Sequence, residues 1–474
     1  MHGALVAKLK DALAPDRVRH EPLELALYGR DASVVPGAAA GVVCFPTSTD
    51  EVRACVRLAV EAGLPFVARG SGTGLSGGAV PVTDSVVIVT TKMDQILEVD
   101  PDERVAWVRP GVLNLDLSRH VAPLGLHFAP DPSSQQACSI GGNVANNSGG
   151  PHCLAYGVTS AHVLAIEVVL PDGSVCLLGG LDPEPDGLDL RGVFIGSEGL
   201  FGIATRIAVR LTPNPPAVRT LLIDFPSVED GAACVSAIIG AGIVPAALEM
   251  MDAACVRAVE EFVHAGYPVD AAAVLLVEVD GLPGGVQAAV DAIGEIAAAH
   301  RARTVRVAAD EAERQLLWKG RKNAFGAVAR MAPDYYLHDT VVPRTRLVEV
   351  LARVYDIAAR HDLLVMNVFH AGDGNLHPLL GFDARRPGVL ERVHAAGEEI
   401  VRASIDAGGV LSGEHGIGIE KRDLMPLLFS PDDLDAQARV RDAFDPAGVA
   451  NPQKVLPAGA RCADLQRVPE GAWI

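Results

Sequence analysis

Residues 69–78, RGSGTGLSGG, constrain the fold of this chain more strongly than its other segments do. Five of these ten residues are glycine, and Ser71, Thr73 and Ser76 add hydroxyl donors. Because glycine lacks a Cβ atom, successive backbone N–H groups can converge on one anion. The segment follows the apolar run 65–68, which is typical of a buried strand. The sequence therefore predicts a phosphate-binding loop after a strand, with a pyrophosphate as its natural ligand.

Gly72, Gly74 and Gly77 match the spacing G-x-G-x-x-G, but this match alone is weak. A Rossmann dinucleotide site needs a helix at the end of the loop. Here the loop continues into AVPVTDSVVIV, in which Pro81 and the β-branched residues predict a loop and a strand. The absence of G-K-[ST] excludes a P-loop, and a flexible surface loop remains the alternative.

Two further segments, PDPSSQQACSIGGNVANNSGG at 130–150 and GSEGLFGI at 196–203, are also rich in glycine. Asn and Ser side chains offer donors to the edge of a heteroaromatic ring, and Gly141 and Gly142 permit close approach of the backbone. Each segment could be a simple turn. Three such loops in one region rich in β-α-β patterns indicate a single long, flat cofactor that carries phosphate.

The composition of the chain argues against several kinds of binding partner and cofactor. The 474 residues include 40 Lys and Arg against 59 Asp and Glu, which gives a net charge of −19. Such an acidic chain is not expected to bind nucleic acid or an anionic membrane as its main partner. None of the eight cysteines forms a C-x-x-C pair, so we expect reduced thiols and no iron–sulfur cluster.

The N-terminal segment lacks the apolar core of a secretory signal, and we expect a cytoplasmic protein. The uncharged stretch 231–248 is long enough to raise the question of a membrane span. Gly240, Gly242 and Pro245 interrupt it, so it predicts a helix followed by a strand of a soluble core.

The pattern of elements changes along the chain. Residues 1–37 predict a helical lead-in, and residues 38–216 alternate short β-rich runs with helices up to the PNPP linker at 213–216. In residues 217–457, strand-like runs at 220–224, 273–279, 304–307 and 365–370 alternate with long helices. This predicts an α+β domain with helices on one face of an antiparallel sheet, followed by a tail at 458–474.

The run VFHAGDGNLH, residues 368–377, predicts a β-hairpin around the dipeptide Asp373-Gly374. In that register His370 lies opposite His377, and two opposed imidazoles can chelate one divalent metal. Glu414 of the segment SGEHGIG could complete a site of two histidines and one carboxylate, with the neighbouring His415 as a base. The alternatives are a solvated hairpin and a capping glutamate.

Six motifs together resemble the FAD-linked oxidase family of the vanillyl-alcohol-oxidase fold, and within it the catalytic D-subunits of bacterial glycolate oxidases. They are RGSGTGLSGGAVP, APDPSSQQACSIGGNVANNSGG, GSEGLFGI, VFHAGDGNLHP, SGEHGIGIEKR and AFDPAGVANPQK. The resemblance implies a two-lobed α+β FAD-binding domain and an α+β substrate (cap) domain with an antiparallel sheet and a helical C-terminal segment that returns to the FAD domain. It also implies FAD-dependent oxidation of small (R)-2-hydroxy acids, with glycolate and D-lactate as the leading substrates.

The resemblance places the FAD-binding residues on the three glycine-rich segments and near the C-terminus. They are Arg69, Gly70, Ser71, Gly72, Thr73, Gly74, Leu75, Ser76, Gly77, Gly78, Pro130, Asp131, Ser133, Ser134, Gly141, Gly142, Asn143, Asn146, Gly157, Glu198, Gly202, Ile203 and Asn451. Some relatives of this fold attach FAD covalently through His or Cys. The glycine loop contains neither residue, so we expect non-covalent FAD.

The resemblance also assigns roles in the second domain. His370, His377 and Glu414 hold one divalent metal, with zinc as the first expectation and manganese or iron as alternatives. His415 is the general base, and the substrate contacts Arg321, Asn375, His370 and His377. The expected partners are a second flavin-type subunit and an iron–sulfur subunit, which could bring the chain to the inner face of the membrane.

Several alternatives remain open at this point. A dedicated D-lactate dehydrogenase and a D-2-hydroxyglutarate dehydrogenase share the motifs, whereas a metallohydrolase or a non-catalytic flavin-binding module would use only part of them. By resemblance, the 2-hydroxyglutarate enzymes bind the second carboxylate through an Asn and a Lys. Here Leu379 and Leu337 stand at those positions, with His338 next to the latter, and the apolar pair favours a short substrate.

Overall fold

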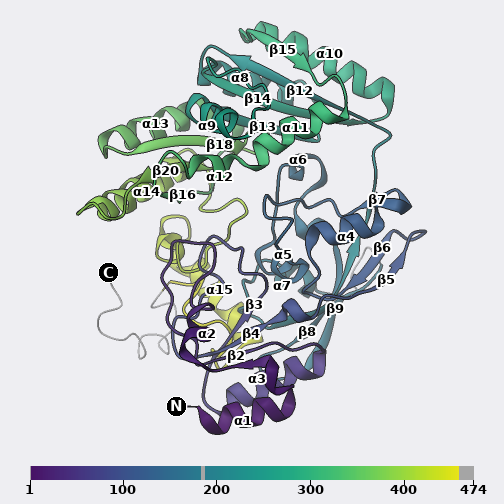
Figure 1. The fold of residues 1–474 in the computed structure, drawn as a ribbon, viewed down its shortest axis with the longest axis vertical. Coiled ribbons are helices and arrows are strands. Elements are labelled where there is room, and N and C mark those ends of the chain that lie inside the picture. Colours follow the sequence, from purple (N-terminus) through teal and green to yellow (C-terminus); the bar gives the residue numbers. More distant parts are fainter. Residues whose placement is uncertain (1, 183–186, 458–474) are drawn as a thin grey trace. The chain divides into compact units, whose positions relative to one another are not determined.

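The computed structural model describes residues 2–182 and 187–457. The expected tail at 458–474, which includes Cys462, lies outside the described residues. The chain divides into two compact units (Figure 1). Unit 1 comprises residues 1–149, 158–213 and the chain from 414 onward, and unit 2 comprises residues 150–157 and 214–413.

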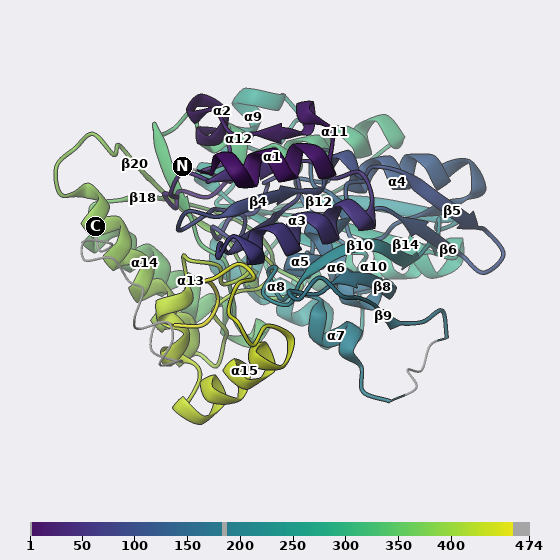
Figure 2. The same ribbon diagram turned by 90° about the horizontal axis from the view of Figure 1, so that it is seen from below.

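The first sheet of unit 1 has the strand order β1-β2-β4-β3. Strands β2 (Val42–Cys44), β4 (Val86–Val89) and β3 (Phe66–Arg69) are parallel, and β1 (Val18–Arg19) is antiparallel to β2. Helix α3 (Thr49–Glu61) begins where the Ser48 side chain accepts the backbone N–H of Glu51. Its apolar stripe packs against the sheet and α1 (Gly3–Ala12). Figure 2 shows the course of the α3 and α1 ribbons beside this sheet. This arrangement confirms a strand at 66–69 directly before the glycine loop.

The second sheet of unit 1 is antiparallel, with the order β5-β6-β10-β8-β9. Its strands are β5 (Ile96–Asp100), β6 (Val105–Val108), β10 (Ile203–Arg210), β8 (Val163–Val169) and β9 (Val175–Gly179). Helices α4 (Asn114–Val121), α5 (Ile140–Asn146) and α7 (Leu190–Phe194) contribute to its apolar core. The C-terminal helix α15 (Pro431–Phe444) belongs to the same unit, where Phe444 stacks on Phe201 with ring centroids 4.6 Å apart. The second and third glycine-rich segments thus lie beside this sheet.

Unit 2 is built on an antiparallel sheet whose main path is β15-β12-β14-β13-β18-β19-β17. Its strands are β12 (Ala217–Phe225), β13 (Ala247–Asp252), β14 (Ala273–Gly281), β15 (Thr304–Val307), β16 (Asp334–Leu337), β17 (Thr340–Val341), β18 (Leu364–His370), β19 (Asn375–Leu376) and β20 (Pro378–Phe382). Strand β20 pairs with both β16 and β18. The antiparallel sheet and the positions of the strand-like runs agree with the sequence prediction.

The helices of unit 2 cover both faces of this sheet, so the prediction of helices on one face was wrong. Helices α8 (Val228–Gly240), α10 (Pro283–Ala299), α13 (Leu347–Arg360) and α14 (Val389–Asp406) share one apolar core with the sheet, and α9 (Ala253–Val263), α11 (Glu311–Lys322) and α12 (Ala324–Val328) share another. Successive β14 residues Val274, Leu275, Leu276 and Val277 alternate between the two cores. A strand that is apolar at successive positions is typically buried on both faces of its sheet.

A short segment from the first half of the sequence, residues 150–157, belongs to unit 2. It contains helix α6 (Cys153–Tyr156). His152 Nε2 lies 3.2 Å from Glu278 Oε1, and the Tyr156 hydroxyl donates to Asp280. Both partners are on β14, so the segment is fastened to the central sheet of unit 2.

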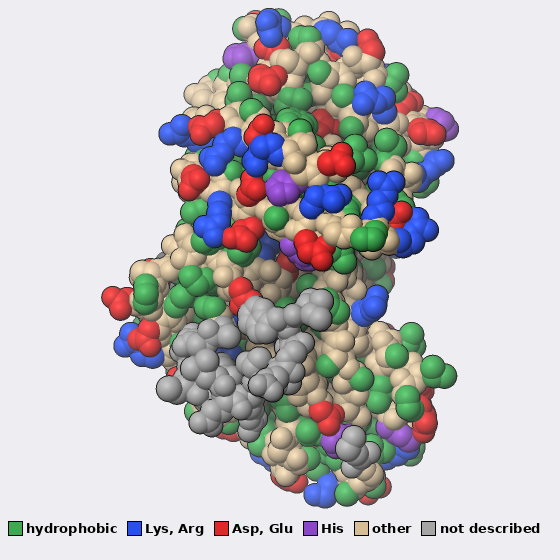
Figure 3. Space-filling view, turned by 90° about the vertical axis from the view of Figure 1, so that its left-hand side faces the viewer, with side chains coloured by type: hydrophobic (Ala, Val, Ile, Leu, Met, Phe, Trp, Pro, Cys, Tyr) green, Lys and Arg blue, Asp and Glu red, His purple; other side chains and the backbone are tan. Residues whose placement is uncertain are grey.

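The uncharged stretch 231–248 is most of helix α8 followed by the start of β13, as predicted. Across the residues that the structure describes, no helix combines the length and the apolar character that a membrane span requires. On the face drawn in Figure 3, Lys and Arg side chains are interspersed with Asp and Glu.

Candidate active site

The three glycine-rich segments meet in one cleft of unit 1. Arg69 and Gly70 from the first segment, Gly141 and Gly142 from the second, and Gly199, Gly202 and Ile203 from the third line it. Gly72 and Gly77 have φ angles of 73° and 79°, a conformation that side chains with a Cβ rarely adopt. A Cβ atom on Gly70 would lie 2.5 Å from Ser139 Oγ. The cleft therefore needs glycine, and its backbone-lined wall fits a flat, phosphate-bearing group such as FAD.

The other expected FAD-binding residues lie on adjoining loops. Ser76, Gly77, Pro130, Asp131, Asn143, Glu198 and Asn451 are buried; Ser71, Gly72, Thr73, Gly74, Leu75, Gly78, Ser134, Asn146 and Gly157 are half-buried; and Ser133 is exposed. Gly157 belongs to unit 2, not to unit 1. Asn143 and Asn451 already bind protein atoms: Asn143 Oδ1 accepts from Asn114 Nδ2 (3.0 Å), and Asn451 Nδ2 donates to the carbonyl oxygens of Gly78 and Glu198 (2.9 and 2.6 Å). The side-chain amides of Asn143 and Asn451 therefore hold the loops around the cleft in place through hydrogen bonds.

The loop that carries His415 is anchored to the loops around the same cleft. The carbonyl oxygen of His415 accepts from Ser76 Oγ and Asn146 Nδ2, both at 3.0 Å. The Glu198 carboxylate accepts the backbone N–H groups of Ile417 (2.7 Å) and Gly418 (2.8 Å). Three expected FAD-binding residues, Ser76, Asn146 and Glu198, therefore fix the backbone at His415 and directly after it.

Burial raises the pKa of Glu198 to about 7, although the N–H groups of Ile417 and Gly418 oppose the shift. Lys454, which sequence reasoning missed, is fully buried and donates to Asn451 Oδ1. Burial lowers the pKa of Lys454 to about 7. Glu198 and Lys454 thus belong to one buried polar network next to the His415 loop, in which Asn451 contacts both residues.

In unit 2, the predicted hairpin exists, but its register was wrong by two residues. His370 pairs with Asn375, and Asn367 pairs with Pro378, so residues 371–374 form a four-residue loop. A two-residue type I′ turn needs positive φ at both central residues, and of the pair Asp373-Gly374 only Gly374 has it (φ 74°). The loop backbone instead bonds to neighbouring segments, with Gly372 N donating to Leu248 O and Val342 N donating to Gly374 O.

The two histidines nevertheless come together. Side chains alternate between faces along a strand, so a shift of two residues leaves His377 on the same face as His370. The ring centroids are 5.1 Å apart, and the residues are 4% and 1% exposed. Asn375, also expected at the site, is 5% exposed and stands directly across from His370. This pair of buried imidazoles can supply two ligands to a divalent metal.

Two buried carboxylates, which sequence reasoning missed, flank the histidines. Glu249 on β13 is directly paired with His370, whose Nδ1 lies 2.8 and 2.9 Å from the two carboxylate oxygens. Asp339 Oδ1 lies 3.6 Å from His377 Nε2 and accepts the backbone N–H of Gly413 at 3.0 Å. Gly413 is the last residue of unit 2, and Glu414 follows it by one peptide bond.

Arg321, the expected substrate residue, is fully buried on α11 beside Glu249. Its Nη2 forms an ion pair with Glu249 Oε2 at 2.5 Å, while Nε and Nη1 form no hydrogen bond within the described residues. Burial disfavours ionisation of Glu249, but Arg321 and His370 outweigh it and lower the pKa of that carboxyl group. A buried guanidinium with unused donors is suited to a carboxylate ligand.

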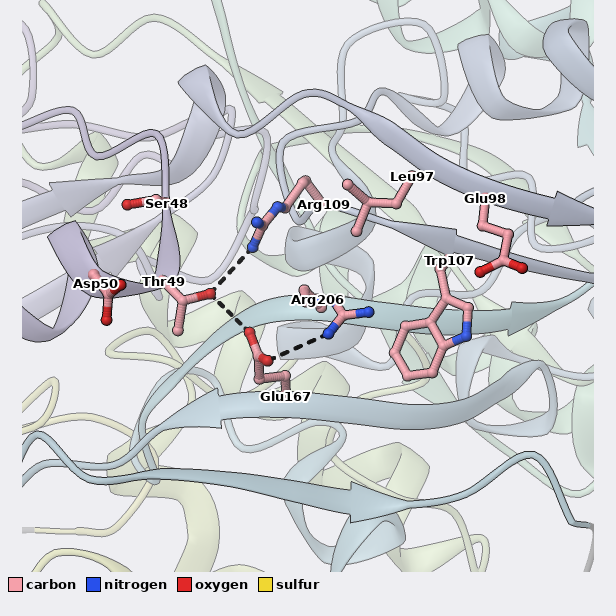
Figure 4. A pocket seen from close by; sticks show the side chains of 9 residues that line it. All are labelled: Ser48, Thr49, Asp50, Leu97, Glu98, Trp107, Arg109, Glu167 and Arg206. Atoms are coloured by element: carbon pink, nitrogen blue, oxygen red, sulfur yellow. Dashed lines mark hydrogen bonds and ion pairs between the residues drawn. The ribbon is translucent and has the colours of Figure 1, made fainter.

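A separate open pocket of unit 1 shares no residue with the glycine-rich cleft (Figure 4). In it Arg109 Nη1 donates to Thr49 Oγ1 (3.1 Å), which donates to Glu167 Oε1 (2.7 Å). Glu167 also lies 3.6 Å from Arg206 Nη1. These groups bond mainly to one another, and none of the expected site residues lines this pocket. It is therefore not the candidate active site.

Two protein-family models cover most of the chain: residues 40–179 match an FAD binding domain, and residues 214–455 match the C-terminal domain of FAD linked oxidases. A glycine-walled cleft in the first region and a buried histidine and arginine site in the second are the parts of an FAD-dependent oxidoreductase. The chain belongs to the family of FAD-linked oxidases. The resemblance predicted from the six motifs, and FAD as the cofactor, are thereby confirmed.

Relatives match over nearly the full chain. Glycolate oxidase subunit GlcD of Escherichia coli K12 is 47% identical over 424 residues, which are 90% of this chain and 85% of that protein. GlcD of Bacillus subtilis 168 is 38% identical over 436 residues (92% and 93%). A D-lactate dehydrogenase of Anaerostipes hadrus is 33% identical over 441 residues (91% of each).

Solved structures show the same fold at low sequence identity. p-Cresol methylhydroxylase aligns with a TM-score of 0.81 at 17% identity over 96% of each chain. The 4-ethylphenol oxidase of Gulosibacter chungangensis aligns with a TM-score of 0.79 at 20% identity over 97% of this chain and 98% of that one. These similarities support the predicted vanillyl-alcohol-oxidase fold.

Proposed function

We propose that this chain oxidises small 2-hydroxy monocarboxylates, namely glycolate and D-lactate, to 2-oxo acids. The observation that carries the proposal is Arg321, a fully buried cation with unused donors, joined through Glu249 to a pair of buried histidines. A 2-hydroxy acid presents a carboxylate for the guanidinium and a hydroxyl group for a metal. The similar glycolate oxidase subunits and D-lactate dehydrogenase support the same substrate class.

Each residue then has a defined task. Arg321 binds the substrate carboxylate through N–H groups that no atom of the described residues uses, and so orients the α-carbon. His370, His377 and Glu414 would hold one divalent metal, zinc by the chemistry of this ligand set. The metal, when bound, would make the substrate hydroxyl more acidic. His415 accepts the hydroxyl proton. FAD, when bound, supplies the hydride acceptor.

The end of the substrate site is apolar, which favours short substrates. Leu337 on β16 is directly paired with Leu379 on β20, and both belong to the core that contains Leu317 of α11. A second substrate carboxylate placed there would be buried without a cation, which costs several kcal/mol. We expect kcat/KM for glycolate and D-lactate to exceed that for D-2-hydroxyglutarate by on the order of 10²-fold or more.

The purified yellow protein can be tested with a dye acceptor and a panel of these three acids. Turnover that is fastest with D-2-hydroxyglutarate would refute the apolar-site argument and favour a 2-hydroxyglutarate dehydrogenase. A matched variant, Leu337→Lys, should improve the dicarboxylate relative to glycolate because it supplies the missing cation. The alternative of a metallohydrolase leaves the FAD-binding domain without a role.

We propose that FAD is bound without a covalent link. The glycine loop, residues 69–78, contains no His or Cys that could attach the flavin. Acid precipitation of the holoprotein should therefore release all of the yellow colour into the supernatant. A coloured pellet after precipitation would show a covalent link and contradict this assignment.

We also propose that electrons leave through partner subunits, a second flavin-type subunit and an iron–sulfur subunit. None of the eight cysteines forms a C-x-x-C pair, and none of the seven that the structure describes is part of a disulfide. The relatives named GlcD are subunits, which supports an assembly of this kind. The isolated chain should reduce an artificial dye much faster than oxygen; peroxide formation at the dye-linked rate would contradict the proposal.

A further inference from the structure

Glu249 occupies a position where a carboxylate is not expected. It lies on the interior strand β13, is 1% exposed, and shares its face of the sheet with Ala247 and Met251 of an apolar core. A buried carboxylate among apolar side chains is destabilising by several kcal/mol unless it is paired. Glu249 therefore depends on the two groups it contacts, His370 and Arg321.

The contact with His370 fixes one tautomer of the imidazole. An ionised carboxylate only accepts hydrogen bonds, so His370 Nδ1, at 2.8 and 2.9 Å from Glu249, must carry the proton. The Nε2 atom then keeps its lone pair, as a metal ligand requires. Carboxylates that hold the far nitrogen of a metal-binding histidine orient the ring and raise its basicity.

The contact with Arg321 fixes the orientation of the guanidinium group. Glu249 Oε2 binds only Nη2 at 2.5 Å and leaves Nε and Nη1 without a partner in the described residues. Both nitrogens therefore keep N–H groups that can donate to a carboxylate ligand. The Glu249 carboxylate thus contacts both Arg321, which is assigned to the substrate carboxylate, and His370, which is assigned to the metal that would bind the substrate hydroxyl.

We propose that Glu249 is a positioning residue, which fixes the tautomer of His370 for the metal and the orientation of Arg321 for the substrate carboxylate. This inference rests on the proposed function, in which His370 is a metal ligand and Arg321 binds substrate. It predicts that loss of the Glu249 charge weakens metal binding and substrate binding together, although Glu249 contacts neither.

The test compares wild-type holoprotein with Glu249→Gln, stripped of metal by a chelator and titrated with Zn²⁺ against a chromogenic competitor. The zinc Kd should rise about 10- to 100-fold in the variant. The KM for glycolate, measured with zinc in excess, should rise by a larger factor than kcat falls. FAD content should stay at the wild-type level.

Glu278→Gln is the matched control. Glu278 is also a buried carboxylate of this sheet, on β14, and it contacts a histidine and an arginine, His152 (3.2 Å) and Arg314 (2.9 Å). It is not among the groups assigned to metal or substrate. Its substitution should lower the melting temperature and leave the zinc Kd unchanged, which separates positioning from general destabilisation.

The outcomes distinguish the inference from the proposed function. Equal zinc Kd and equal KM in Glu249→Gln and wild type would overturn the positioning role while leaving the proposed function standing. A wild-type chain that binds no zinc, or that oxidises none of the 2-hydroxy acids, would overturn both. If Glu249→Gln does not fold, Glu249→Asp serves instead: its side chain is one methylene shorter, and an unchanged zinc Kd would refute the proposal.

Discussion

Replacing His415 with alanine should lower kcat for glycolate by about 10²-fold or more, the usual contribution of a general base. The loss follows from the proposed role of the imidazole, since no other group assigned here accepts the hydroxyl proton. FAD and metal should remain bound, because the backbone of His415 holds its place through its carbonyl oxygen and the proposed ligands are His370, His377 and Glu414. Turnover, flavin absorbance and zinc content measured on one preparation provide the check.

A histidine on the surface provides the control for His415. His120, exposed on α4, should tolerate substitution by alanine without a change in kcat. A His415→Ala enzyme that turns over at the wild-type rate would assign the base to another residue.

Arg321→Met should produce the second large effect, a decrease of about 10²-fold or more in kcat/KM for glycolate. Removing one partner of a buried charged contact typically costs 2–5 kcal/mol. Methionine is similar in length but has no donors, so the substrate carboxylate would be left unpaired. Arg321→Lys should recover only part of the loss, because an ammonium group cannot form the planar two-fold contact. Steady-state kinetics on glycolate would measure both effects.

The Arg321→Met variant also removes the cationic partner of buried Glu249 and leaves it only the contact with His370. This loss of stability can be separated from the loss of substrate binding. In the double variant Arg321→Met/Glu249→Gln the uncompensated charge is gone, so the melting temperature should recover. The kcat/KM value should stay low, because the substrate contact is still missing. Recovery of kcat/KM in the double variant would show that Arg321 serves only to neutralise Glu249.

Local patterns in the sequence were enough to predict these strands of unit 2 and the close approach of His370 and His377. The runs at 220–224, 273–279, 304–307 and 365–370 all lie in strands, since each carries its own β pattern. The hairpin register was wrong because turn chemistry alone was used, whereas hydrogen bonds from Gly372 and to Gly374 widen the loop. The histidines still share a face because the error was an even number of residues.

The carboxylates of the site could not be found in this way. Glu249 reaches His370 across 121 residues of sequence, and the run ALEMMD contains no motif that identifies this glutamate as a site residue. Asp339 likewise depends on the placement of Ser412 and Gly413, 73 and 74 residues later. Pairing between distant strands is a property of tertiary structure, and only an acidic residue inside an otherwise apolar strand hinted at it.

The segment 150–157 has a consequence for domain dissection. An expressed fragment that begins at the PNPP linker and ends at Gly413 would contain every strand of the unit 2 sheet, yet it would lack His152 and Tyr156. Glu278 and Asp280 would each lose a hydrogen-bonded neighbour, and the apolar core against which Leu154 packs would lose that side chain. Unit 2 is therefore not a self-contained part of the sequence from 214 to 413, and chimeras between relatives should exchange residues 150–157 together with 214–413.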